Sequence, residues 1–235
     1  ALKDVHNTKY CLKLDIKQFY PSIDHDILKE ILRRKIKDKD LLWLLDEIID
    51  SSDGVPIGNY LSQYFANLYL TYFDHWLKET KLVKYYFRYA DDIVILHHDK
   101  MYLHELLSNS KKYLSDNLKL TVKENYQIFP VEARGIDFVG YKFYHTHTLL
   151  RKGIKKNFAR MLKVNRNDQS IASYLGWAKH CNSINLINKL LGYSQIIDIP
   201  NSVTFMDDLE DCIKWIINNK INKYKIFHKI ACAHT

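Results

Sequence analysis

The fold is indicated most directly by residues 84–96, whose sequence is Lys-Tyr-Tyr-Phe-Arg-Tyr-Ala-Asp-Asp-Ile-Val-Ile-Leu. Two runs within it, 84–88 and 93–96, are rich in aromatic and β-branched residues, and such runs on either side of a short polar break are typical of a β-hairpin. Asp91 and Asp92 are therefore expected at the tip of a hairpin. Two adjacent carboxylates repel each other and resist leaving water, so this arrangement indicates that a divalent cation offsets their charge.

A third carboxylate, Asp15, ends another apolar run, in the strand predicted at residues 10–16, whose leucines alternate with polar residues. Phosphoryl transfer can use two cations about 4 Å apart, one activating the attacking hydroxyl and one steadying the leaving oxygen. Asp15 and Asp91 bridging two metals, with Asp92 beside them and the Ile16 backbone carbonyl as a further ligand, would meet that need. Mg²⁺ is the expected ion because it prefers oxygen ligands, and Mn²⁺ is an alternative. The plainer alternatives are a solvated Asp-Asp turn and an Asp15 that only caps a turn.

Five blocks, in this order along the chain, resemble those of reverse transcriptases: Leu14 to His25, Pro56 to Gln63, Tyr89 to Asp92, Gly135 to Tyr141 and Ser173 to His180. They are similar, in turn, to the first catalytic block, the block before the long palm helix, the catalytic hairpin, the primer-grip hairpin and the thumb helix of bacterial members. The resemblance covers roughly residues 10–190. It implies an RNA-directed DNA polymerase with template RNA, a DNA primer and dNTPs as partners, and a small basic accessory protein as a further partner.

The second block, Pro56 to Gln63, indicates which type of reverse transcriptase the chain resembles. Most reverse transcriptases, including those of group II introns, have Gln-Gly followed by Ser-Pro there, whereas this chain has Ile57-Gly58 and Ser62-Gln63. That pattern resembles the enzymes of diversity-generating retroelements, which copy a template RNA and misincorporate mainly opposite adenine. The same positions disfavour a group II intron maturase, which would also need further DNA-binding domains after the thumb.

The resemblance places four residues around the incoming nucleotide. Tyr20 corresponds to a bulky aromatic under the sugar, where a ring would clash with a ribose 2′-hydroxyl; the alternative is an aromatic packed in the core. Lys17 is placed to meet the triphosphate as a point charge, and a surface lysine is the alternative. Gly58 has no Cβ and would let the nascent base pair approach the backbone, unless it is an ordinary loop glycine. Ile57 cannot donate the hydrogen bonds of a glutamine amide.

The remaining assignments concern the nucleic acid. The primer grip would comprise Phe138, Val139, Gly140 and Tyr141, and the basic residues that follow it would contact the duplex backbone without reading sequence: Arg151, Lys152, Lys155 and Lys156. The chain has 35 Lys and Arg against 27 Asp and Glu, which suits a polyanionic partner, although charge alone also fits a merely basic protein. Many relatives carry near Tyr126 a lysine proposed to protonate the leaving pyrophosphate; Lys123 is the candidate substitute here.

The expected fold class is α+β: a polymerase palm, in which an antiparallel sheet with an RRM-like core is backed by helices, followed by a helical thumb. The palm would span residues 1–150 without a fingers region, the thumb 151–192, and an extension of unassigned role 193–235. Besides the hairpin, periodicity predicts a strand at 10–16, a helix capped by Asp24 and ending at Lys35, and a helix over 41–49. It also predicts a long helix after Gly58 bearing Leu61, Phe65, Leu68, Tyr72 and Trp76, a helix at 101–116, a strand at 118–122, and helices from 154, at 170–181, at 184–191 and at 206–217.

The cellular setting follows from absences in the sequence. The four cysteines lie far apart, which indicates neither a zinc site nor a disulfide framework. No run approaches the length of a membrane span and no signal peptide is found, so a cytoplasmic protein, bacterial or phage-encoded, is expected.

Three functions stay open, partly because fourteen residues, the first an alanine, precede Asp15. The chain is therefore expected to be a fragment, a truncated open reading frame or one piece of a split enzyme. It is an RNA-templated DNA polymerase, a nucleic-acid-binding palm and thumb without turnover, or a template-independent polymerase of the phage-defence type. A primer-extension assay separates these three functions. The first predicts extension that follows the RNA sequence, the second predicts binding without extension, and the third predicts extension without a template.

Replacing Ile57 with Gln is expected to raise the fidelity of nucleotide incorporation. An apolar contact discriminates weakly between nucleotides, whereas a glutamine amide restores hydrogen-bond donors whose loss of a partner is penalised. Sequencing of the extension products measures the error spectrum; a spectrum identical to that of the unsubstituted protein would exclude this origin of low fidelity.

Overall fold

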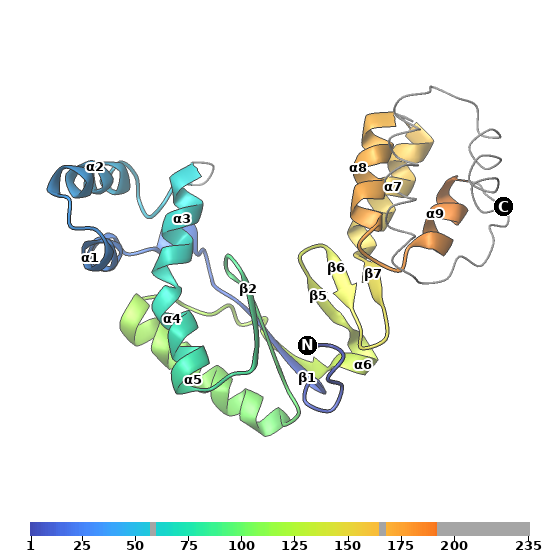
Figure 1. The fold of residues 1–235 in the computed structure, drawn as a ribbon, viewed down its shortest axis with the longest axis horizontal. Helices are drawn as coiled ribbons and strands as arrows, with labels where there is room; N and C mark the ends of the chain where they lie inside the picture. Colours follow the sequence, from blue (N-terminus) through green and yellow to red (C-terminus); the bar gives the residue numbers. More distant parts are fainter. Residues whose placement is uncertain (57–59, 165–167, 192–235) are drawn as a thin grey trace. The chain divides into compact units, whose positions relative to one another are not determined.

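The computed structural model describes residues 1–56, 60–164 and 168–191 (Figure 1). The chain forms two compact units, Ala1–Phe138 and Val139–Thr235, which are described separately. Ile57 and Gly58 lie outside the described residues, as does the helix predicted at 206–217.

The first unit is built on a four-stranded antiparallel sheet. Its strands are β1 (Tyr10–Asp15), β2 (Tyr85–Tyr89), β3 (Asp92–His97) and β4 (Gln127–Pro130), and their order across the sheet is β2-β3-β1-β4. In β3 the four residues from Ile93 to Leu96 are all buried. Both faces of this central strand are therefore covered, as a continuous apolar run predicts.

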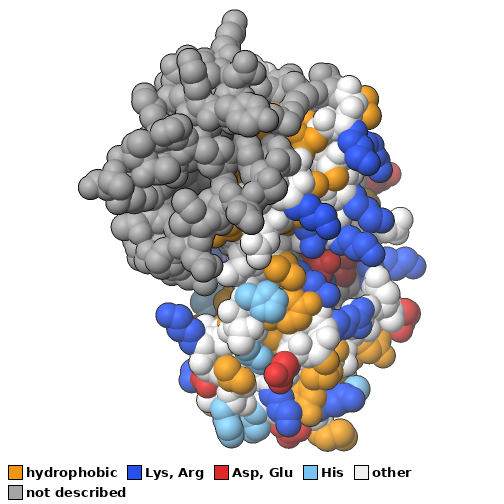
Figure 2. Space-filling view, turned by 90° about the vertical axis from the view of Figure 1, so that its right-hand side faces the viewer, with side chains coloured by type: hydrophobic (Ala, Val, Ile, Leu, Met, Phe, Trp, Pro, Cys, Tyr) orange, Lys and Arg blue, Asp and Glu red, His pale blue; other side chains and the backbone are white. Residues whose placement is uncertain are grey.

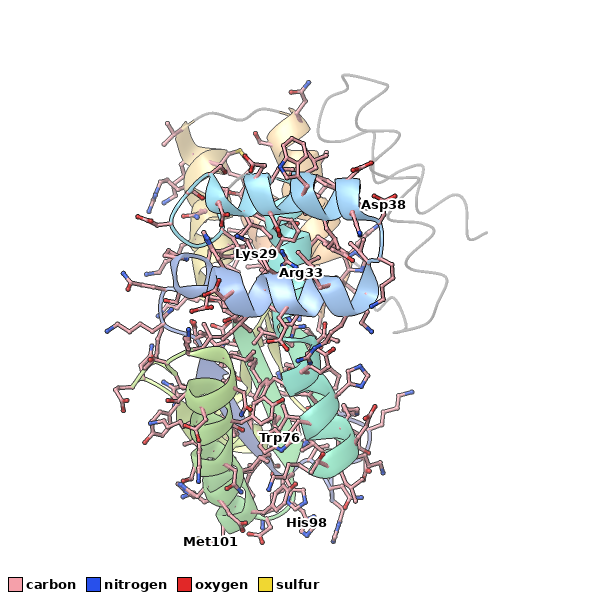
Figure 3. The ribbon with its side chains drawn as sticks, turned by 90° about the vertical axis from the view of Figure 1, so that its left-hand side faces the viewer. Lys29, Arg33, Asp38, Trp76, His98 and Met101 are labelled. Atoms are coloured by element: carbon pink, nitrogen blue, oxygen red, sulfur yellow. The ribbon has the colours of Figure 1, made fainter. Side chains whose placement is uncertain are left out.

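Two helices, α1 and α2, precede the long helical segment that follows Gly58 in the sequence. α1 (His25–Lys35) begins after Asp24, whose carboxylate accepts a hydrogen bond from the Ile27 amide at 3.1 Å, and this confirms the predicted cap. α2 (Lys39–Asp50) follows and is held to α1 by ion pairs that join Lys29 to Asp50 and Arg33 to Asp46. Figure 3 shows Lys29 and Arg33 lying between the two helices.

The helix predicted after Gly58 consists of three consecutive segments: α3 (Tyr60–Tyr69), α4 (Thr71–His75) and a π-helical turn, Trp76–Thr80. Buried side chains occur at four-residue intervals, at Phe65, Tyr69, Phe73 and Leu77, and Ala66 and Leu70 beside them are buried as well. Of the predicted stripe, Phe65 belongs to this set, and the other four residues are half-buried against the same core. α5 (Lys100–Leu118) lies beside α4 on the sheet (Figures 1 and 3), and its Tyr113 ring stacks on Trp76 with centroids 4.7 Å apart.

The strand predicted at 118–122 is wrong. α5 runs on to Leu118, Lys119 ends it in the left-handed conformation with φ 50°, and β4, the strand beside β1, comes later. Residues 118–122 contribute an isolated bridge between Val122 and Ile16. Leu118, Leu120 and Val122 are all buried in the core. The alternation therefore marked buried positions correctly, although these residues end a helix and begin the following segment rather than form a strand. The unit ends with α6 (Val131–Arg134) and the short strand β5 (Ile136–Phe138).

The second unit begins with a hairpin of β6 (Tyr141–Phe143) and β7 (Thr148–Leu150). Three helices follow: α7 (Lys152–Val164), α8 (Asp168–Ala178) and α9 (Ile184–Leu191). Their small core comprises Phe158, Ile171, Leu175, Ala178 and Ile187. No helix in the described part of the chain is both long enough and apolar enough to cross a membrane.

Replacing Tyr69 with Phe is expected to lower the free energy of unfolding by about 1–3 kcal/mol, the cost of leaving buried polar groups without a hydrogen bond. The Tyr69 hydroxyl donates to the Leu118 carbonyl at 2.8 Å and accepts from the Asp24 amide at 3.3 Å. Urea denaturation measures the change. Tyr64→Phe, which alters an exposed side chain, is the matched control; equal effects of the two substitutions would contradict the assigned role of the buried hydroxyl.

Candidate active site

The register of the sheet brings the three predicted acids together. β1 and β3 pair so that Asp15, the last residue of β1, stands opposite Asp92, the first residue of β3. β2 and β3 are antiparallel neighbours, and their pairing begins at Tyr89 and Asp92. The predicted hairpin is therefore confirmed, and Ala90 and Asp91 form its two-residue turn. Ala90 has φ 51°, in the left-handed region that costs a residue with a Cβ about 1–2 kcal/mol. The tip of the hairpin is thus strained beside Asp91.

The carboxyl groups of Asp15 and Asp91 lie close enough to influence each other's ionisation. Burial raises the pKa of Asp91, and the negative charge of Asp15 and a side-chain hydrogen bond with it raise that pKa further. Two carboxyl groups can share a hydrogen bond when one of them carries a proton, and a cation can take the place of that proton. The pair is therefore chemically suited to a divalent metal ion, which commonly binds through one or two protein carboxylates together with substrate phosphates.

Two lysines form ion pairs with the acidic residues. Lys123 Nζ lies 2.9 Å from Asp15 Oδ1, and this contact raises the pKa of the lysine. Lys13 Nζ lies 3.2 Å from Asp92 Oδ2 and also donates to the backbone carbonyl of Asp137 in β5. Lys13 and Asp15 are two residues apart on β1 and share a face of the sheet. The positive charges thus offset the repulsion among the carboxylates.

The three carboxylates do not form a ready metal-binding group. Among the residues that the structure describes, no three or more His, Cys, Asp and Glu side chains are arranged to hold a metal ion. Asp15 and Asp92 are paired with lysines instead. The two hydrogen bonds around the Ile16–Val122 bridge run from Lys17 N to Thr121 O and from Lys123 N to Asp15 O, so neither involves the Ile16 carbonyl that was predicted as a ligand.

Tyr20 lies close to the turn of the β2–β3 hairpin. Its side chain is half-buried, and burial followed by the charge of Asp91 raises the pKa of its hydroxyl. The Tyr20 carbonyl accepts from the Val55 amide at 2.9 Å, and a Cβ on Gly54, which has φ 63°, would come within 2.5 Å of the same oxygen. Gly54 is therefore needed where the chain approaches Tyr20. Lys17 is exposed beside this segment.

The four residues predicted for the primer grip are divided between the two units. Phe138 ends β5 in the first unit, and the other three belong to the second. Gly140 has φ 89°, and a Cβ there would lie 2.2 Å from the ring of Trp177 in α8. The Tyr141 hydroxyl donates to the Trp177 carbonyl at 2.9 Å. In the second unit this turn is thus packed closely against α8.

The predicted backbone-binding residues lie at the start of α7. Lys152 and Lys156 are exposed, and Arg151 and Lys155 are half-buried. Lysines at positions 152, 155 and 156 fall on one helical face. In Figure 2, Lys and Arg side chains gather along one flank of the face shown, next to apolar side chains.

Sequence reasoning missed two basic residues of the site, Lys13 and Arg88. Arg88 bonds to Asp74 of α4 and to the Ala90 carbonyl of the turn. One signal was available for both: each is a charged residue in a predicted strand and lies within three residues of an acid of the site.

Comparisons with known proteins identify the family of the chain. The family model described as reverse transcriptase (RNA-dependent DNA polymerase) matches residues 1–143, so the chain belongs to the reverse transcriptase family. It is 27% identical over 196 residues to the Retron Ec73 reverse transcriptase of Escherichia coli, covering 73% of this chain and 62% of that protein.

Solved structures show the same fold. Apo telomerase from Candida tropicalis matches with a TM-score of 0.50 and 18% identity, over 72% of this chain and 36% of that one. Telomerase from Candida albicans in complex with a fragment of telomeric RNA matches with a TM-score of 0.52 and 13% identity, over 95% of this chain and 49% of that one. The α+β polymerase fold is thereby confirmed. The chain spans less than two thirds of the length of each of these relatives.

Replacing Asp15 with Asn is expected to lower the pKa of Asp91, because it removes a neighbouring negative charge that disfavours ionisation. Replacing Lys123 with Met is expected to raise the same pKa, because the lysine charge favours the carboxylate. A ¹³C NMR titration of the carboxyl groups without divalent cations measures both shifts. Lys119→Met, which removes the partner of the distant Asp24, is the control; an Asp91 pKa unmoved by either site substitution would refute the assigned contacts.

Proposed function

We propose that this chain carries the palm and thumb of an RNA-directed DNA polymerase, which extends a DNA primer on an RNA template by metal-dependent nucleotidyl transfer. The single observation that carries this proposal is the register of the β1–β3 pair, which sets Asp15 opposite Asp92 and beside the turn residue Asp91. Membership of the reverse transcriptase family supports the choice of reaction. We assign residues 1–150 to the palm, 151–192 to the thumb, and no role to 193–235.

In this proposal Asp15 and Asp91 hold two divalent cations, expected to be Mg²⁺, with Asp92 and the Ile16 carbonyl beside them. Bound cations of this kind lower the pKa of an attacking hydroxyl and stabilise the charge on a leaving pyrophosphate. Lys123, whose ammonium group lies against Asp15, holds a proton at Nζ that a leaving pyrophosphate can accept. Lys13 holds Asp92 in place from the other side.

The remaining residues are assigned to substrate binding. Tyr20, half-buried near Asp91, would exclude a ribose 2′-hydroxyl, and Lys17, Ile57 and Gly58 would complete the nucleotide site. The primer grip, residues 138–141, and the basic residues Arg151, Lys152, Lys155 and Lys156 would hold the duplex. Backbone contacts of this type carry no sequence information.

Two subtypes follow from different observations. The Ile57-Gly58 and Ser62-Gln63 pattern favours the error-prone enzyme of a diversity-generating retroelement. Similarity to the Retron Ec73 reverse transcriptase favours a retron type. Misincorporation concentrated opposite template adenine would select the first, and an error spectrum without that concentration would exclude it.

Replacing Asp91 with Asn is expected to reduce primer extension on an RNA template by about a hundredfold or more. Metal binding contributes several kcal/mol of transition-state stabilisation, and about 1.4 kcal/mol corresponds to a factor of ten in rate. Circular dichroism checks that the fold is intact, and Asp116→Asn, on the exposed face of α5, is the control. Near-normal extension by the Asp91 variant would overturn the assignment.

Binding of primer and template without extension by the unsubstituted chain would favour the non-catalytic alternative, and extension without a template would favour the defence-type polymerase.

A further inference from the structure

Arg88 of β2 connects the palm helices to the turn of the catalytic hairpin. Its Nε and Nη2 donate to the two carboxylate oxygens of Asp74 in α4, at 2.8 and 2.5 Å. Its Nη1 donates to the Asn67 side chain of α3 at 3.0 Å and to the backbone carbonyl of Ala90 at 3.1 Å. The Arg88 side chain is only 12% exposed, so these bonds are largely shielded from water and the planar guanidinium has a single orientation.

The anchor for Arg88 is itself fixed. The Tyr86 hydroxyl donates to Asp74 Oδ1 at 2.5 Å, from the same strand as Arg88. Asp74 lies next to Phe73, which is fully buried in the core. Asp74 is therefore a rigid support, and Arg88 transmits its position to the turn.

The bond to Ala90 acts on one peptide unit. The Ala90 carbonyl and the Asp91 amide belong to the same planar peptide group. Fixing the Ala90 carbonyl therefore also fixes the Asp91 amide and the Asp91 Cα, from which the carboxylate extends. This constraint is needed because Ala90 has the strained φ of 51°.

We propose that Arg88 is a positioning residue: anchored on Asp74, it fixes the peptide between Ala90 and Asp91 and so directs the Asp91 carboxylate toward Asp15. The inference rests on the proposed function, in which these two carboxylates hold divalent cations. An ion pair that only stabilises the fold is the competing explanation, since losing one partner of a buried pair is destabilising.

The test measures Mn²⁺ binding directly, from the signal of free Mn²⁺ in electron paramagnetic resonance, with Mn²⁺ alone as the probe. Arg88→Lys keeps a positive charge beside Asp74 but loses the planar fork that reaches the Ala90 carbonyl. We expect its Kd for Mn²⁺ to rise roughly tenfold, the effect of one hydrogen bond to a charged group. Tyr85→Phe removes a hydroxyl of the same strand that bonds to Asp4 rather than to Asp74, so its Kd is expected to match that of the unsubstituted protein.

A milder variant keeps the test decisive if Arg88→Lys does not fold. Asn67→Ala removes one acceptor of Nη1 and leaves the pair with Asp74 in place, and we expect Kd to rise by roughly a factor of three. A purely structural role predicts that thermal stability falls while Kd is unchanged in every folded variant at Arg88 and Asn67, and that result would overturn the inference.

Two further samples separate this inference from the proposed function. If the unsubstituted protein does not bind Mn²⁺, or if Asp91→Asn binds it equally well, the proposed metal site itself is refuted. If these two behave as proposed but Arg88→Lys and Asn67→Ala retain the original Kd, only the role of Arg88 is refuted.

Discussion

The antiparallel register between β1 and β3 is the constraint on which the site depends. It places Asp15 opposite Asp92, with the turn residue Asp91 adjacent. Buried side chains on both strands set this register, among them Leu14 and Ile93, which also pair. A shift of one residue would turn the leucines of β1 toward water and carry Asp15 to the opposite face of the sheet. The hydrophobic core therefore fixes where the carboxylates meet.

Charge balance explains how the chain tolerates this convergence. Three carboxylates gathered at one end of the central strands β1 and β3 would repel one another, and burial already raises the pKa of Asp91. Lys123 and Lys13 approach from neighbouring segments and offset the charge. Arg88 adds a positive charge behind the turn while its own charge is matched by Asp74. The acids can thus be held close together in the folded chain, and a cation would exchange partners with the lysines rather than enter an uncompensated negative site.

The parts of the fold that local patterns specify were predictable. The hairpin, the strand ending at Asp15 and the cap at Asp24 follow from periodicity and residue type over a few positions. Residues 118–122 were misassigned because a buried alternation also fits the end of a helix. The contacts of Lys13 with Asp92, 79 residues away, and of Arg88 with Asp74 depend on strand register and helix packing, which no local pattern contains. Motif resemblance located the carboxylates, but the residues that orient them required the structure.

The central claim is that Asp15 and Asp91 jointly hold divalent cations. Its most direct test is a crystal structure of the protein grown with Mn²⁺ and an incoming nucleoside triphosphate, with the metal located by anomalous scattering. The claim predicts an anomalous peak within about 2.5 Å of oxygens from both residues, close to the usual metal–oxygen distance. Anomalous peaks that lie away from both carboxylates, with the triphosphate bound, would contradict it.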